Sequence, residues 1–134
     1  MLDPAQVPAV ASEEMLARFV LFSAHFRKAN ATVKPDAFMP HPRVELSITR
    51  HLEATTAELW REGGRVAALR ALALYGRADV LTEIFETQRL RVVPEPIPEN
   101  PNHADVIDWP ADKPQQKMKA TVIASRAQFV PRPS

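Results

Sequence analysis

Side chains that can do chemistry cluster in "NPNHADVIDWPADKPQQK", residues 100–117. His103 and Asp105 are two residues apart, so on a strand they would lie on the same face. A carboxylate beside an imidazole fixes the tautomer and stabilises the imidazolium, and general base catalysis uses this arrangement. We therefore take His103 and Asp105 as candidate ligand-binding residues, together with the neighbouring Asn102 and Trp109.

A structural role for the same stretch is the alternative that we favour. The side chains of Asn100, Asn102 and His103 can bond the backbone of a loop that proline stiffens. Trp109 would then fill the core, and Asp112 would cap a following helix. Contact with a ligand comes second and catalysis third, because no nucleophile lies at a defined spacing from the histidine.

A metal site is not expected. Zinc bound without cysteine usually needs three convergent side chains. No third ligand lies near His103 and Asp105 at a standard spacing, so His25, His41 or His51 would have to come from elsewhere in the chain. We expect no metal and no cofactor.

A second candidate group lies in "LYGRADV", residues 74–80. Arg77 could bind an anion, or it could simply pair with Asp79 on the surface, where such a pair contributes little to stability. If the chain binds a small ligand or is an enzyme, we expect His103, Asp105 and Arg77 to line one cleft, with Ser47 as a further candidate.

Composition excludes several classes of function. The chain of 134 residues has no cysteine, so disulfides, thiol catalysis and cysteine-bound zinc are ruled out, and a reducing cytoplasm is expected. A formal net charge of +1 makes nucleic-acid binding unlikely. No apolar run approaches the roughly 20 residues of a membrane helix, so no membrane contact is expected.

Hydrophobic periodicity and capping residues predict the elements that would position these side chains. Thr55 and Glu58 form a T-x-x-E capping box, while Gly63–Gly64 and Gly76 are expected to end helices because glycine costs about 1 kcal/mol inside a helix. Asp79 is expected to cap the next helix. Residues 13–26 fit either a helix or a strand, and we favour a short helical lead-in followed by a strand at about 18–23. Further strands are predicted at 44–50, 89–93 and 104–109, and helices at 55–62, 65–75, 80–88 and from Asp112 to about 127.

These elements predict one α+β domain, residues 13–130. We expect a small sheet of three to five short strands, with three or four helices on one side. Residues 1–12 are expected to be a flexible N-terminal arm and residues 131–134 a C-terminal tail. Residues 32–43 are expected to be a loop with one turn at Pro35 and Asp36, and residues 94–103 an extended connector.

Four segments carry a resemblance to other proteins. They are "KPDAFMP", "ELSITR", "LYGRADV" and "NPNHADVIDWPADKPQQKMKATVIA". In this order they resemble a family of small uncharacterised bacterial proteins with an LSxxR, GRAD and NHAxVxxWP pattern, over most of residues 18–130. The resemblance implies an intact single domain and a bacterial cytoplasm, with a possible place among the accessory proteins of bacterial defence loci. It implies no activity and no site residues.

A weaker likeness concerns Arg18 and Ser47, on two different predicted strands. An arginine and a serine so placed, with Glu83 or Glu86 as the acid, are similar to the layout of ADP-ribosyltransferase clefts. The sequence lacks the glycine-rich or aromatic context that would hold NAD, so we favour a half-exposed sheet face.

The function that we predict is a non-enzymatic interaction module, an adaptor that docks a protein partner. The lack of a catalytic signature, the proline-stiffened loops and the two terminal arms favour this hypothesis. The contact surface would be "PNHADVIDWP", residues 101–110, with Trp109 as anchor because aromatic residues dominate interface energetics. The alternative is the small-ligand binder or enzyme described above.

Overall fold

The structure is a computed structural model that describes residues 1–40 and 44–134. Residues 41–43, which include His41 and the end of the predicted loop 32–43, lie outside the described residues. The elements follow in chain order: β1 (Met15–Val20), η1 (Ser23–His25), β2 (Phe26–Arg27), β3 (Thr32–Val33), η2 (Pro35–Phe38), β4 (Leu46–Arg50), α1 (Thr56–Leu69), β5 (Gly76–Leu81), α2 (Thr82–Thr87), β6 (Arg91–Pro94), β7 (His103–Ile107), α3 (Lys113–Arg126) and β8 (Gln128–Pro131).

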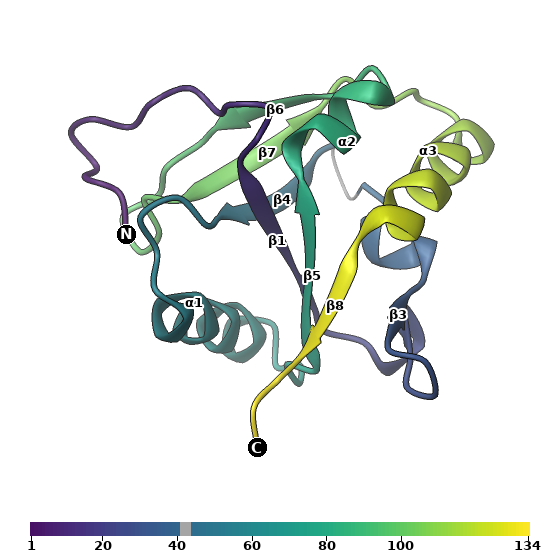
Figure 1. The fold of residues 1–134 in the computed structure, drawn as a ribbon, viewed down its shortest axis with the longest axis horizontal. Coiled ribbons are helices and arrows are strands. Elements are labelled where there is room, and N and C mark those ends of the chain that lie inside the picture. The colour runs from purple at the N-terminus through teal and green to yellow at the C-terminus, as the bar shows by residue number, and fades with distance from the viewer. Residues whose placement is uncertain (41–43) are drawn as a thin grey trace.

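A six-stranded antiparallel sheet organises the chain, in the order β6-β7-β4-β1-β5-β8 (Figure 1). Strands β2 and β3 form a separate two-stranded hairpin. The predicted α+β class is confirmed, and three α-helices fall within the predicted range. The predicted three to five strands are too few, because the described residues form eight.

Strand β5 is one of the four strands, with β2, β3 and β8, that were not predicted. Residues 76–81 were expected to end one helix and begin another, with Asp79 as a cap. They instead pair with β1 and β8 along their length. A Cβ on Gly76 would lie 2.5 Å from the carbonyl oxygen of Val130, so only glycine fits where these strands meet. Long-range pairing therefore overrides the local i,i+4 apolar pattern, and only Thr82–Thr87 is helical.

Helix α1 runs unbroken through Gly63 and Gly64, where the sequence predicts a break. Gly63 faces the sheet, and a Cβ there would come within 2.9 Å of the ring of Phe19 and 3.0 Å of Leu74. The glycine thus lets α1 approach the sheet closely, and this packing outweighs its helix penalty. The predicted capping box is confirmed: the Thr55 side chain accepts from the Glu58 backbone, and the Glu58 side chain from the Thr55 backbone.

Several other local predictions are confirmed. Asp112 caps α3, with Pro114 in its first turn. The predicted turn at Pro35 is the short helix η2. The strands predicted at 44–50, 89–93 and 104–109 correspond to β4, β6 and β7, whereas the first strand begins at Met15 rather than at residue 18. Residues Gln128–Pro131, where no strand was predicted, form the edge strand β8.

The two faces of the sheet are covered differently. Leu16 and Val20 of β1 face the main core, which includes Phe38 of η2, Phe85 of α2 and Ile123 of α3. Phe19 points to the opposite face and packs with a smaller cluster that includes Trp60 and Val66 of α1. Figure 1 shows α1 and α3 well apart on the sheet. The helices therefore cover both faces, not one side as expected, and α1 leaves part of its face open.

The N-terminal segment, expected to be a flexible arm, is bonded to the sheet at several points. Leu2 is buried, and its backbone N–H donates to Oδ1 of Asn102 at 2.8 Å. The guanidinium of Arg50 donates to the carbonyl oxygens of Pro8 at 2.7 Å and Ala9 at 3.2 Å. Among residues 1–40 and 44–134, no helix has the length and apolar character needed to cross a membrane.

Substitution of the two neighbouring glycines by alanine tests the packing of α1. Nothing lies within 4 Å of a Cβ on Gly64, so Gly64→Ala should raise the free energy of unfolding by up to ~1 kcal/mol. Gly63→Ala gains the same helix propensity, but it forces the Phe19 ring to move, which should lower the free energy of unfolding by ~1–3 kcal/mol. Urea unfolding should therefore find Gly63→Ala less stable than Gly64→Ala. Equal stabilities would contradict the close approach.

Candidate functional site

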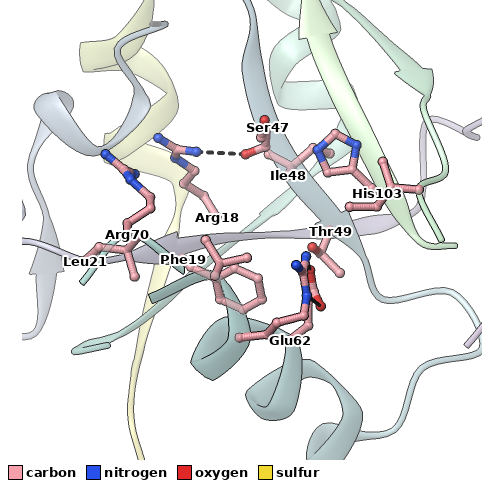
Figure 2. A pocket seen from close by; sticks show the side chains of 12 residues that line it. Arg18, Phe19, Leu21, Ser47, Ile48, Thr49, Glu62, Arg70 and His103 are labelled. Atoms are coloured by element: carbon pink, nitrogen blue, oxygen red, sulfur yellow. Dashed lines mark hydrogen bonds and ion pairs between the residues drawn. The ribbon is translucent and has the colours of Figure 1, made fainter. Parts of the chain in front are cut away.

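A pocket of about 410 Å³ opens on the sheet face that α1 only partly covers (Figure 2). Its walls come from β1, β4, the start of β7, the second half of α1 and the connector before β7. The apolar part of the lining includes Phe19, Leu21, Val66 and Ile97. Charged and polar side chains form the rest of the lining, so the pocket offers a mixed environment to a ligand.

Arg18 lies at one end of the pocket, where β1 and β4 separate. The two strands pair only at Leu16–Arg50 and Ala17–Thr49. Beyond this point the Arg18 side chain takes the place of backbone pairing: its Nη1 donates to the carbonyl oxygen of Ser47 at 2.9 Å, and its Nε to that of Ala37 at 3.0 Å. These two bonds hold the guanidinium in a fixed orientation.

Arg70, at the C-terminal end of α1, lies beside Arg18 (Figure 2). Its guanidinium lies 5.7 Å from the centre of the Phe22 ring, and its charge is favourable at the end of a helix. Within residues 1–40 and 44–134, no carboxylate lies within ion-pair distance of Arg18 or Arg70. Two positive charges therefore meet without a counter-charge in the described part of the chain.

The electrostatics of Arg18 reflect this arrangement. Burial, as the larger cause, and the nearby charge of Arg70 together lower the pKa of Arg18 to about 10. Arg18 still carries its charge at neutral pH, because this value lies well above 7. An anion bound between the two guanidinium groups would relieve the cost of keeping both charged.

A third arginine of the pocket differs, because it has a partner. Arg65 Nε donates to Oε1 of Glu62 at 2.7 Å, one turn earlier on α1, and a second bond joins Arg65 Nη2 to the other oxygen. This bidentate pair neutralises itself. The excess positive charge of the pocket is therefore located at the Arg18–Arg70 end.

His103 lines the far side of the pocket, next to Asp105 and Ser47 (Figure 2 shows His103 and Ser47). His103 Nδ1 bonds the carbonyl oxygen of Glu95 at 2.8 Å, and its Nε2 lies 3.8 Å from Oδ1 of Asp105. Ser47 Oγ donates to the same Asp105 oxygen at 3.5 Å. The expected shared face of His103 and Asp105 is therefore observed, although Asp105 itself does not line the pocket.

Asp105 is held where its ionised form is disfavoured. Burial is the largest cause and raises the pKa of Asp105, and the charges of Glu45 and Glu95 act in the same direction. The neighbouring His103 and the Ser47 hydroxyl act against that rise. The group is thus a carboxyl that takes up a proton more readily than usual, at the edge of the pocket.

Arg77 and Asp79 form a separate cluster and do not complete the predicted cleft. Arg77 Nε donates to Asp79 at 3.0 Å, His51 Nε2 lies 3.0 Å from the same carboxylate, and the guanidinium stacks 4.7 Å from the ring centre of Trp60. These side chains lie on β5, three strands away from His103 on β7, or about 14 Å at the usual strand spacing. The arginines that line the pocket together with His103 are Arg18, Arg65 and Arg70.

Arg77 nevertheless has one unusual atom. Its Nη1 is buried without a hydrogen-bond partner among the described residues. The Arg77 guanidinium lies over the Trp60 ring of α1, and this cation–π contact compensates in part for the absent hydrogen bond. Because Arg77 and Asp79 are about nine-tenths buried between sheet and helix, they do not form the surface pair that was the alternative.

Asn102 and Trp109 are integrated into the fold. The Asn102 side chain is buried, accepts from the backbone of Leu2, and donates to the carbonyl oxygens of Arg50 and Leu52, both at 2.8 Å. Trp109 is 6% exposed, and its Nε1 donates to the carbonyl oxygen of Val106 at 3.1 Å. The expectation that Trp109 is an exposed anchor is therefore wrong, because its ring belongs to the main core.

No metal centre is formed by the described residues. Among residues 1–40 and 44–134, no group of three His, Asp or Glu side chains converges at metal-binding distances. His25, His51 and His103 lie in different regions of the fold, and His41 lies outside the described residues.

Arg18 carries a weak signal of its role in the sequence, whereas Arg70 carries none. Arg18 is the one charged residue in the apolar run "MLARFVLF", residues 15–22, which is unusual for a buried strand. Arg70 looks like any other arginine of the central region. Arg18 does meet Ser47 as in the enzyme-like layout considered above, but Glu83 and Glu86 are exposed on α2 and do not line the pocket.

Comparison with known proteins adds no functional assignment. No protein-family model, no curated protein and no solved structure matches this chain. The resemblance to small bacterial proteins therefore stays a prediction, and the geometry of the pocket carries the functional proposal.

Alanine substitutions of Asn102 and His103 distinguish a side chain that stabilises the fold from one that lines the pocket. Asn102→Ala removes three side-chain hydrogen bonds in a buried position and should lower the free energy of unfolding by ~2–4 kcal/mol. His103→Ala removes a partly exposed side chain with one bond to the backbone and should cost less than ~1 kcal/mol. Denaturant unfolding measures both, and a larger loss for His103→Ala would contradict this division.

Proposed function

We propose that this protein binds a small anionic molecule in the pocket between α1 and the sheet. One observation carries the proposal: the guanidinium groups of Arg18 and Arg70 share one end of the pocket, and neither has a carboxylate partner among the described residues. Of the two, only Arg18 is partly buried, and a partly buried charge is normally paired because its removal from water is costly; Arg70 is exposed beside it. An anionic ligand would provide the missing partner.

The arginine geometry suits such a ligand. Arginine presents its donors in a rigid planar fork that matches carboxylate and phosphate oxygens. Arg18 uses Nε and Nη1 for the carbonyl oxygens of Ala37 and Ser47, and its Nη2 has no hydrogen-bond partner within residues 1–40 and 44–134. Because these bonds fix the group before a ligand arrives, little conformational entropy is lost on binding.

The remaining walls suit a small molecule rather than a bare ion. Phe19, Leu21, Val66 and Ile97 offer apolar surface beside the arginines, and Thr49 and His103 add polar groups. A volume of about 410 Å³ lies within the usual range for ligand pockets, roughly 300–1,000 Å³. The ligand would place its anionic group on the arginines and its body over the apolar side chains.

The adaptor function predicted from the sequence is a second proposal, with less support. Its partner would need an exposed apolar patch. Among the described residues, the large exposed apolar side chains include Phe22 and Leu69 near Arg70, and Met118 and Val122 on α3, across the sheet. They do not form one surface with residues 101–110, where the contact was expected. The cytoplasmic setting likewise stays a proposal.

Substitution of Arg70 tests the anion site. Titration of ¹⁵N-labelled protein with benzoate should shift the Arg18 Nε and Arg70 Nε signals and the amide signals of the pocket. Arg70→Gln should weaken binding by ~10-fold or more, because it removes one charge-assisted contact worth about 1.5–3 kcal/mol. Arg70 has neither an ion pair nor a side-chain hydrogen bond among the described residues, so the variant should fold normally.

Arg126→Gln is the matched control, since Arg126 is exposed on α3, across the sheet from the pocket. It should leave the benzoate titration unchanged. The proposal fails if benzoate leaves the pocket signals unmoved, or if both variants weaken binding equally, as a general effect of net charge would.

A further inference from the structure

We propose that the ligand of this pocket is a phosphate monoester with a small, mostly apolar body. This inference rests on the proposed function and names its ligand class. It depends on three features of the described residues: the charge at the arginine end, the donors available there, and the chemistry of the surfaces beyond.

The charge at the arginine end calls for a dianion. Arg18 and Arg70 together carry two positive charges without a carboxylate partner in the described part of the chain. Arg65 adds no further net positive charge, because its ion pair with Glu62 neutralises it. A carboxylate or a sulfate ester would leave one positive charge uncompensated, whereas a phosphate monoester carries about −1.5 to −2 charges at pH 7.

The donors at this end also match phosphate. Arg18 approaches from β1 and Arg70 from the end of α1, so the two forks reach the same space from different elements. A phosphate presents three terminal oxygens in different directions and can accept from both forks at once. A planar carboxylate has only two oxygens and fits one fork better than two.

The surfaces beyond the arginines define the body of the ligand. Phe19 of β1 and Val66 of α1 both line the pocket and pack against the same small cluster, and Ile97 adds a third apolar side chain to the lining. A flat or compact apolar group would bury surface there. Thr49 and His103 lie past this region and can bond a polar substituent at the far end of the body.

The groups that titrate near the arginine end determine how binding depends on pH. His25 of η1 is close enough for Arg18, Arg70 and Lys34 to lower its pKa, although burial lowers it most and Asp36 of η2 raises it. Asp36 is itself paired with Lys117 of α3. His103 lies at the far side. Acidification favours the charged form of His25, which would strengthen binding of any anion.

The phosphate itself has the opposite dependence. Its second pKa is about 6, so roughly a tenth of a phosphate monoester remains dianionic at pH 5. The two effects separate when phosphate is compared with a monoanion of the same shape, because the histidine contribution is common to both. Phenyl phosphate and phenyl sulfate form such a pair.

Calorimetric titration of the full chain with both compounds at pH 7.5 and pH 5.0 provides the test. Phenyl phosphate should bind ~10-fold or more tightly than phenyl sulfate at pH 7.5, and this ratio should fall by about fivefold to tenfold at pH 5.0, where most of the phosphate is a monoanion like the sulfate. Arg70→Gln should abolish the preference, whereas Arg126→Gln should keep it. Circular dichroism establishes that each variant is folded.

The outcomes separate the two proposals. Equal affinity for both compounds, with an unchanged ratio at the two pH values, would overturn the phosphate assignment and leave an anion pocket in place. An absence of binding by either compound, together with unmoved pocket signals for benzoate, would overturn both proposals. An unchanged phosphate preference in Arg70→Gln would place the binding site elsewhere and also overturn the assignment.

A terminal phosphate of a nucleic acid has the same chemistry as a phosphate monoester, so a further titration must distinguish the two ligands. A dinucleotide with a 5′-phosphate, titrated under the same conditions, should bind more weakly than phenyl phosphate, because a pocket of about 410 Å³ favours a small body. Tighter binding of the phosphorylated dinucleotide, lost when it ends in a 5′-hydroxyl, would overturn the small-molecule part of the assignment.

Discussion

The buried guanidinium of Arg50 determines how the strands around the pocket are arranged. It is fully buried at the end of β4, bonds both oxygens of Glu14 at 2.8 Å, and donates to the carbonyl oxygens of Pro8 and Ala9. Removal of one partner from a buried ion pair typically costs about 3–5 kcal/mol. The Arg50–Glu14 pair therefore holds the N-terminal segment and the start of β1 against β4. It also fixes the short β1–β4 pairing, beyond which the strands separate and Arg18 fills the gap.

Arg18 and Arg50 show how the same residue type can serve two purposes. Arg50 has its carboxylate, and its bonds are satisfied within the protein, so it stabilises the fold. Among the described residues, Arg18 is bonded only to backbone oxygens and lies beside another positive charge, that of Arg70. These bonds bridge β1 and β4, but they leave the two positive charges without a carboxylate partner in the described part of the chain. Binding of an anion would explain why the charges of Arg18 and Arg70 lie together. The apolar walls beside the two arginines make a small organic anion a suitable ligand.

Local signals in the sequence predicted much of the fold. The Thr55–Glu58 capping box, the Asp112 cap and the alternation in "VELSITR" depend on neighbouring residues, so they could be interpreted from the sequence alone. The glycines of α1 and β5 could not, because they serve close approaches to residues far along the chain. The same division holds for the site. His103 and Asp105 share a strand and were predicted as a pair, whereas Arg18 and Arg70 are 52 positions apart and meet only through the tertiary fold.

The most direct test of this account is to locate a bound anion. A crystal soaked with tungstate, a tetrahedral dianion like phosphate, can be measured at the tungsten absorption edge, where anomalous scattering marks the metal. The account predicts the strongest anomalous peak within hydrogen-bond reach of both the Arg18 and Arg70 guanidinium groups. A pocket without an anomalous peak, while tungstate occupies exposed arginines elsewhere, would contradict it.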